Sequence, residues 1–155
     1  MIKKTLVMKY LDQKKIPYEA FEYEVTHHLT GEEIADVLNE NAKEVFKTIV
    51  CDDYNKHYYV FIIPVLEQLD LKKCAKIVGA KKLELLPLKE LHDITGYYRG
   101  GCSPIGMKRK YLTHIDSNVD KFEFIYISAG EVGKQIKIDP KQLIALEKIK
   151  VAELI

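Results

Sequence analysis

The segment Thr95–Gly106 constrains the fold of this chain most strongly, because it holds four glycines and one proline in twelve positions. A segment of this composition forms neither a regular helix nor a regular strand. Glycine lets backbone N–H groups face a ligand with no Cβ in the way, and Pro104 fixes the direction in which the segment leaves. We therefore expect a shaped loop, which serves either as a cradle for an anion or carbonyl group or as a structural connection.

Lys47 is the second informative residue, because it lies within an apolar, β-branched run from Glu44 to Cys51 that predicts a buried strand. An ammonium group in a low-dielectric site costs free energy unless it has a partner, so this lysine suggests a functional role. Strand alternation allows a second interpretation, in which Lys47 lies on the solvated face while Phe46 and Thr48 point inward.

Five motifs in the same order along the chain resemble those of the YbaK/EbsC proteins. These are free-standing aminoacyl-tRNA deacylases related to the editing domain of bacterial prolyl-tRNA synthetase. The motifs are VFKT at 45–48, Pro64 with QLDLKK at 68–73, GAKK at 79–82, TGY at 95–97 and GGCSPIG at 100–106. The resemblance extends from Lys14 to Gly130, and five ordered motifs are far more specific than one glycine-rich loop.

The order of predicted elements indicates an α/β or α+β fold with a mixed sheet, because helical and β-prone segments alternate and some strands are hairpin neighbours. The length of 155 residues corresponds to a single domain, residues 1–155. The family resemblance implies a mixed, barrel-like sheet flanked by helices. We expect helices over 6–16, 30–38, 70–78, 87–93 and 140–148, and strands over 18–23, 43–51, 57–65, 82–86, 110–115, 122–128 and 135–138.

The net charge of +1 conceals an uneven distribution. Residues 71–115 hold ten Lys or Arg against three acidic residues, a net charge of +7, which leaves −6 for the rest of the chain. Such a basic segment is typical of a protein that binds a polyanion, although a solvated lysine-rich helix explains part of it equally well. The low total charge predicts few phosphate contacts and modest RNA affinity, which a partner that delivers the RNA would offset.

No cofactor, metal or membrane segment is predicted. The sequence contains no nucleotide-binding glycine motif, and the neighbouring His27 and His28 do not form a zinc motif. Three widely spaced cysteines, Cys51, Cys74 and Cys102, suit reduced thiols in a cytoplasmic protein. No apolar run reaches the length of a bilayer span.

The resemblance implies hydrolysis of the ester that joins a mischarged amino acid to the 3′-terminal adenosine of tRNA, with cysteinyl-tRNA(Pro) as the expected substrate. In this mechanism the thiol of the cysteinyl group attacks its own ester carbonyl and releases a cyclic thiolactone. The protein orients the aminoacyl group and stabilises charge, so no protein nucleophile is needed. Cys102 is an alternative nucleophile that the family comparison disfavours.

The resemblance also implies the roles of single residues. Lys47 supplies a cation near the ester, and backbone N–H groups around Gly100 and Gly101 contact its carbonyl. The implied pocket further contains Tyr23, Thr48, Cys102, Ser103, Pro104, Ser128 and Gly130. One departure is Gln135, which stands where many relatives carry an aspartate, so the acceptor for the substrate α-ammonium is either weakened or supplied elsewhere. Apart from the resemblance, the charge of the basic segment makes Lys108, Arg109 and Lys110 the expected RNA contacts.

Two alternatives remain open at this stage. The same fold could deacylate another mischarged residue, such as alanine, with a water molecule as nucleophile. The chain could also be a non-catalytic module that binds tRNA or a synthetase, which full exposure of Lys47 would favour. Prolyl-tRNA synthetase is the expected protein partner.

Overall fold

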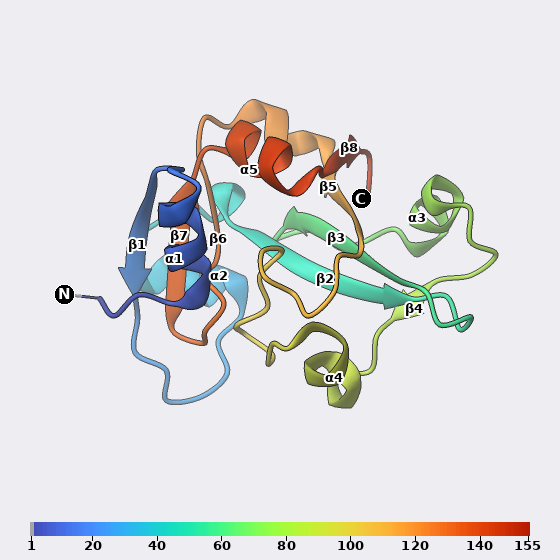
Figure 1. Ribbon diagram of the computed structural model, residues 1–155, viewed down its shortest axis with the longest axis horizontal. Helices are drawn as coiled ribbons and strands as arrows, with labels where there is room; N and C mark the ends of the chain where they lie inside the picture. The colour runs from blue at the N-terminus through green and yellow to red at the C-terminus, as the bar shows by residue number, and fades with distance from the viewer. Residues whose placement is uncertain (1) are drawn as a thin grey trace.

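The computed structural model describes residues 2–155 as a mixed α/β fold with two β-sheets (Figure 1). One of the sheets is entirely antiparallel. In the second sheet, three adjacent strands run parallel to one another. The three-stranded sheet has the order β1 (Tyr18–Glu22), β7 (Lys134–Ile138), β6 (Ile125–Ser128). The five-stranded sheet has the order β4 (Glu84–Leu85), β2 (Phe46–Asp52), β3 (Tyr58–Pro64), β5 (Leu112–Asp116), β8 (Lys150–Ala152).

The two sheets do not close into a barrel, which corrects the expectation of a barrel-like sheet. A single parallel bridge between Val45 and Tyr126 joins them. Pairing does not extend further toward the N-terminus because the preceding residues, Ala42–Glu44, form a 3-10 turn rather than a strand. The same turn explains why β2 begins at Phe46, three residues later than the sequence pattern predicts.

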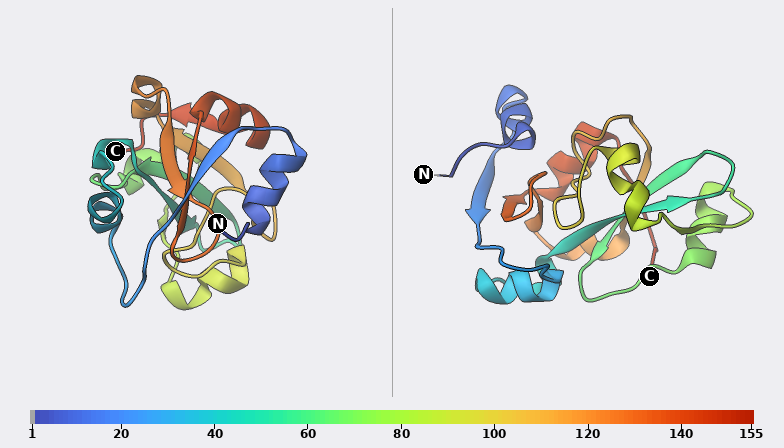
Figure 2. Two further views of the ribbon diagram at one scale, coloured as in Figure 1. Left: turned by 90° about the vertical axis from the view of Figure 1, so that its left-hand side faces the viewer. Right: turned by 90° about the horizontal axis from the view of Figure 1, so that it is seen from below.

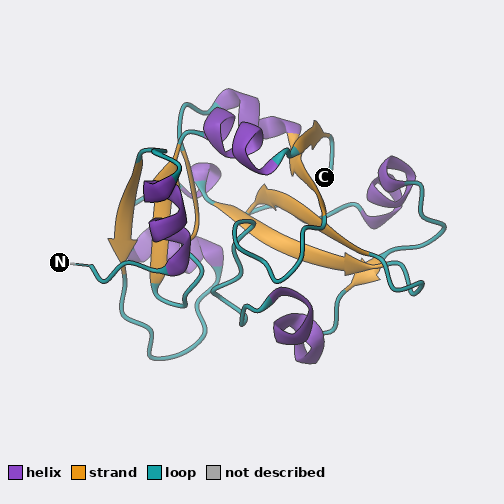
Figure 3. Ribbon diagram, in the orientation of Figure 1, coloured by secondary structure: helices purple, strands orange, loops and turns teal. Residues whose placement is uncertain are grey.

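The helices lie around the sheets (Figure 3). Their ends carry the capping residues that the sequence predicts. Thr30 and Glu33 form a reciprocal capping box at the start of one helix. At the start of another helix, the side chain of Asp70 accepts a hydrogen bond from the backbone N–H of Lys73, and Gly79 ends that helix in the left-handed conformation. The helices are α1 (Leu6–Gln13), α2 (Gly31–Val37), α3 (Leu71–Val78), α4 (Leu91–Thr95) and α5 (Pro140–Glu147). Within residues 2–155, no helix has both the length and the apolar character needed to cross a membrane.

The main hydrophobic core lies between the two sheets, α1 and α5. Figure 2 shows how these elements are arranged. Fully buried isoleucines from four strands, β3, β5, β6 and β7, dominate it, and Met8 and Leu11 of α1 cover one side. A second core under α3 contains Cys51, Cys74 and Leu154. Ile105, from the segment 95–106, is fully buried in the main core, which anchors that segment beside the sheets.

The glycine-rich segment 95–106 forms a loop from the end of α4 onward, as predicted. It packs against the turn between β6 and β7. A Cβ on Gly101 would lie 3.0 Å from the backbone nitrogen of Val132 and 3.1 Å from the carbonyl carbon of Glu131, so only glycine fits there without displacing the turn. The hydroxyl of Tyr97 donates to the carbonyl of Ile105 and ties the two ends of the loop together. The loop is therefore fixed in shape on both sides.

Candidate functional site

A cleft of about 550 Å³ lies between the start of β2, the N-terminal turn of α2, the glycine loop and the adjoining ends of β6 and β7. Charged, polar and apolar side chains all face it. The lining residues are Tyr23, His28, Leu29, Thr30, Gly31, Glu32, Ile34, Val45, Phe46, Lys47, Thr48, Val65, Arg99, Gly100, Cys102, Ser128 and Gln135. Segments from all parts of the chain between residues 23 and 135 thus meet at one place.

Lys47 lies at this cleft and is half-buried rather than fully exposed. Burial lowers the pKa of its ammonium group, while the carboxylate of Glu67 opposes that shift. Neighbouring Phe46 points into the core and is 3% exposed. The two interpretations of Lys47 thus resolve into an intermediate one, in which a partly desolvated cation faces an open cavity.

Gln135 lines the cleft from β7 and is 4% exposed. With its amide nitrogen turned toward Glu40, it donates to both carboxylate oxygens, over 3.0 and 3.1 Å. Burial raises the pKa of Glu40 to about 7, the neighbouring Glu44 adds to this effect, and Lys137 opposes it. A carboxyl group that titrates near neutral pH thus lies directly behind the glutamine that replaces the expected aspartate.

The glycine loop contributes Gly100 and Cys102 to the cleft. Gly100 has a φ angle of +87°, a conformation that favours glycine, and lies near His28. Burial raises the pKa of the Cys102 thiol to about 12, with a hydrogen bond to Thr95 opposing the shift. The thiol is therefore protonated at neutral pH, which makes it a poor nucleophile.

The structure brings most of the predicted pocket residues together. Tyr23, Lys47, Thr48, Gly100, Cys102, Ser128 and Gln135 all line the cleft. Ser128 is held in place because its hydroxyl accepts from the backbone N–H of Gly130, over 3.2 Å. The residue positions that the family resemblance implies thus converge in space, although they come from five separate segments.

Four predicted residues lie outside the lining of this cleft. Ser103 is buried and its hydroxyl accepts from the backbone N–H of Ile105, so it stabilises the loop. Gly101 faces the β6–β7 turn, as described above. Gly130 faces Val7 and the ring of Tyr97, with a φ angle of +95°. Pro104 lines a different pocket. In this structure the visible contacts of these residues shape the loops around the cleft.

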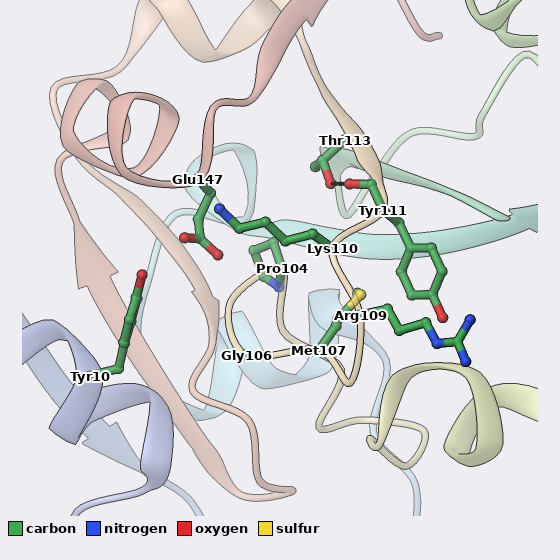
Figure 4. Close-up of a pocket in the computed structure, with 9 residues that line it drawn as sticks. All are labelled: Tyr10, Pro104, Gly106, Met107, Arg109, Lys110, Tyr111, Thr113 and Glu147. Carbon is green, nitrogen blue, oxygen red and sulfur yellow. Dashed lines mark hydrogen bonds between the residues drawn. The ribbon is translucent and has the colours of Figure 1, made fainter.

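The basic segment Lys108–Lys110 borders that second pocket, which has a volume of about 200 Å³ (Figure 4). Arg109 and Lys110 line it, and Figure 4 shows Lys110 reaching toward Glu147 while Arg109 points the opposite way. Burial raises the pKa of Glu147, and Lys110 opposes that shift. Glu147 thus partly offsets the charge of Lys110. Lys108 and Arg109 are therefore the cations more available to a bound ligand.

Sequence reasoning missed three residues at the site. His28 and Arg99 line the cleft, and Glu40 supports Gln135 from behind. Arg99 carried a usable signal, because it is the one charged residue within the glycine loop. Glu40 carried none, since it lies in a short connection and meets Gln135 only through the folding of the chain.

Comparison with known proteins identifies the family. Residues 26–146 match the model of the aminoacyl-tRNA editing domain. A protein of Enterococcus faecalis, provisionally named the Cys-tRNA(Pro)/Cys-tRNA(Cys) deacylase EbsC, is 40% identical over 152 residues, which cover 97% of this chain and 93% of that protein.

Solved structures share the fold. A provisionally assigned trans-editing enzyme for prolyl tRNA synthetase superposes with a TM-score of 0.79 at 23% identity, covering 88% of this chain and 85% of its own. A hypothetical protein of known structure gives a TM-score of 0.86 at 20% identity, with coverage of 96% and 97%. Together with the family match and the 40% identical relative, the convergence of the motif residues on one cleft shows that this chain belongs to the aminoacyl-tRNA editing domain family.

Proposed function

We propose that this protein deacylates mischarged aminoacyl-tRNA in trans, with cysteinyl-tRNA(Pro) as its main substrate. The observation that carries the proposal is the cleft in which the half-buried Lys47, the glycine loop and the Gln135–Glu40 pair face one cavity. Membership of the editing family and the provisional name of the 40% identical relative support the same reaction. The whole chain, residues 1–155, acts as one catalytic domain in this proposal.

In the proposed reaction, the thiol sulfur of the cysteinyl group attacks its own ester carbonyl. The new S–C bond forms as the C–O bond to the ribose breaks, and the ribose oxygen takes up the proton. The products are a cyclic thiolactone, which water later opens, and a free tRNA 3′ end. Holding the thiol next to the carbonyl supplies most of the rate gain, because both reacting groups belong to one bound substrate.

Lys47 and the glycine loop stabilise the charge that develops on the ester oxygens. A partly desolvated ammonium group acts more strongly on a nearby oxyanion than a fully solvated one does. The backbone N–H of Gly100, which lines the cleft, is the second source of stabilisation in this proposal. The N–H of Gly101 is not available for this role, because it donates to the carbonyl of Tyr98 over 2.9 Å. Cys102 takes no covalent part, since its thiol remains protonated at neutral pH.

The Gln135–Glu40 pair binds the substrate α-ammonium group. Because the amide nitrogen of Gln135 donates to Glu40, its carbonyl oxygen points away from Glu40 and serves as the acceptor. The carboxylate behind the amide polarises it and adds a long-range attraction for a cation. The acceptor that the aspartate of other family members would supply is thus divided here between a neutral amide and a carboxylate behind it.

A non-catalytic binding module fits less well, because that alternative needs a fully exposed Lys47 and the side chain is half-buried. The substrate implies a cytoplasmic protein that binds the aminoacylated 3′ end of tRNA. Prolyl-tRNA synthetase is the proposed source of the mischarged substrate and a partner that compensates for the weak net charge of +1.

The experiment that tests the proposal compares hydrolysis of cysteinyl-, alanyl- and prolyl-tRNA(Pro) by the purified protein. We expect rapid loss of the cysteinyl ester and little loss of the prolyl ester. Preferential cleavage of alanyl-tRNA(Pro) would assign the protein to the alanine alternative. Binding of all three without cleavage would identify it as a non-catalytic module.

A further inference from the structure

A stacked aromatic pair, formed by the half-buried His92 and the exposed Tyr98, lies next to the cleft but outside its lining. The imidazole of His92 in α4 stacks on the ring of Tyr98, with ring centroids 4.3 Å apart and planes inclined by 12°. Tyr98 nevertheless remains 67% exposed. One face of the tyrosine ring is therefore covered by the imidazole and the other face is open to solvent.

The position of this pair links the cleft to the basic segment. Tyr98 directly precedes Arg99 and Gly100, which line the cleft. On the other side, the side chain of Lys108 lies against Gly96, 3.2 Å from the position of a Cβ there, and its backbone N–H donates to the carbonyl of Thr95 over 3.0 Å. Tyr98 thus lies on the path along the loop from Lys108, at Gly96, to the cleft residues Arg99 and Gly100.

The charge along this path suits a nucleic acid. Between Asp93 and Asp116 the chain has no acidic residue but carries Arg99, Lys108, Arg109 and Lys110. Phosphates are attracted by such cations, and unpaired bases stack on exposed aromatic rings. An isolated surface tyrosine would not indicate a binding site. Here the open ring face, the supporting imidazole and the flanking cations together indicate one.

We propose that Tyr98, braced by His92, is a stacking platform for an unpaired base at the 3′ end of the RNA substrate. The inference rests on the proposed deacylase function and extends it by placing the single-stranded RNA end on the outer face of the glycine loop. Stacking of one base fixes the direction from which the terminal ribose enters the cleft, with its phosphates facing Arg99 and Lys108. Tyr98 touches the substrate as a binding residue and takes no part in the chemistry.

The test uses the full-length protein and a labelled RNA stem-loop that ends in single-stranded CCA, together with the same RNA carrying abasic residues at those three positions. The Kd of both RNAs is measured for the wild-type protein and for Tyr98→Ala and Tyr98→Phe. Tyr98→Phe retains the ring and is the matched control. Because Tyr98 is largely exposed, all variants should fold, which thermal unfolding verifies.

We expect wild type and Tyr98→Phe to bind the CCA end equally and Tyr98→Ala to bind it roughly tenfold more weakly, the effect of losing about one stacked base. With the abasic RNA, all three proteins should bind equally weakly. Equal binding of the CCA end by wild type and Tyr98→Ala would overturn the proposal, and so would equal binding of the two RNAs by the wild-type protein.

Hydrolysis of cysteinyl-tRNA(Pro), measured on the same samples, separates the two proposals. If the wild-type protein cleaves the ester but Tyr98→Ala has an unchanged KM, the platform is refuted and the deacylase stands. If RNA binding depends on Tyr98 but no protein cleaves the ester, the deacylase is refuted and the platform stands. The expected result is a raised KM for Tyr98→Ala with an unchanged kcat, as befits a residue that binds the RNA away from the ester.

Discussion

With its amide nitrogen turned toward Glu40, Gln135 donates to both carboxylate oxygens of Glu40, over 3.0 and 3.1 Å. The two residues come from β7 and from the connection that follows α2, so the fold alone brings them together. Their pairing places a carboxyl group whose pKa is about 7 behind the cleft. We expect this relationship to give the site a pH dependence that a directly exposed aspartate would not show.

We predict that Glu40→Gln weakens catalysis mainly above neutral pH. Because the pKa of Glu40 is raised from 4.5 to about 7, its negative charge is present above pH 7 and is lost as the pH falls through that value. The ratio of wild-type to Glu40→Gln kcat/KM for cysteinyl-tRNA(Pro) should therefore be largest near pH 8 and approach one near pH 6. Titration of the substrate itself cancels in this ratio.

The exposed residue Glu123 supplies the control for this measurement. Glu123→Gln should have the same kcat/KM as wild type at every pH. A constant wild-type to Glu40→Gln ratio between pH 6 and 8 would mean that the charge of Glu40 does not reach the substrate.

We predict that Lys47→Ala lowers the rate of ester cleavage by about 10²- to 10³-fold, the usual effect of losing one positioned electrostatic group. Its melting temperature should not fall, because the substitution removes a partly buried charge. Single-turnover kinetics and thermal unfolding measure the two effects. Lys43→Ala, at an exposed lysine in the preceding turn, is the matched control. A well-folded Lys47→Ala protein with near-normal turnover would remove Lys47 from the mechanism.

We predict that glutamine at Lys108, Arg109 and Lys110 weakens tRNA association more than it slows single-turnover cleavage at saturating protein, because phosphate contacts position RNA without doing chemistry. The salt dependence of log Kd should become shallower by about 0.7 to 0.9 for each phosphate that the protein no longer neutralises. Lys110 should contribute least to this change, as it faces Glu147.

Three exposed lysines in and just after α3, Lys72, Lys76 and Lys81, provide a control with the same change in net charge. Their replacement by glutamine should leave the salt slope unchanged. If both triple variants reduce affinity equally, RNA binding responds only to the total charge, and the basic segment is not a specific RNA contact.

We predict that Gly101→Ala destabilises the protein by about 1–3 kcal/mol, the usual cost of overpacking. The new Cβ would meet the backbone of Glu131 and Val132 at 3.0 to 3.1 Å, and a backbone cannot move aside as a flexible side chain can. Urea unfolding measures the change. Gly79→Ala is the comparison: its φ of +73° strains any side chain, but no atom lies within 4 Å of the added Cβ. Gly101 has no positive φ, so its loss of stability reports the contact alone. Unchanged stability of Gly101→Ala would show that the loop and turn separate easily.

The sequence patterns located most elements because local signals determine them. The capping box at Thr30, the cap at Asp70 and the terminator Gly79 all function as predicted. Strand β8 was missed, since Lys150–Ala152 is short, largely exposed and paired in parallel with β5. The prediction of a closed sheet was wrong, because closure depends on contacts between distant segments. Here a single bridge from Val45 to Tyr126 joins the two sheets.

The grouping of the candidate site residues was predictable to a similar extent. Lys47 and Gly100 from the motifs and Gln135 from β7 do meet in one cleft. Their surroundings were not predictable, because the role of Glu40 depends on its distance from Gln135, and that of Tyr98 depends on its stacking with His92. Neither relationship leaves a pattern in local sequence.

The most direct test of the account compares the cleavage rates of cysteinyl-, seryl- and alanyl-tRNA(Pro) by wild-type protein and by Cys102→Ala. A thiol attacks an ester far better at neutral pH than a hydroxyl does, and a methyl group cannot attack at all. We therefore predict fast cleavage of the cysteinyl ester, slow cleavage of the other two, and nearly full activity in Cys102→Ala. Equal rates for cysteinyl and alanyl esters, or an acyl-enzyme on Cys102, would contradict substrate-assisted catalysis.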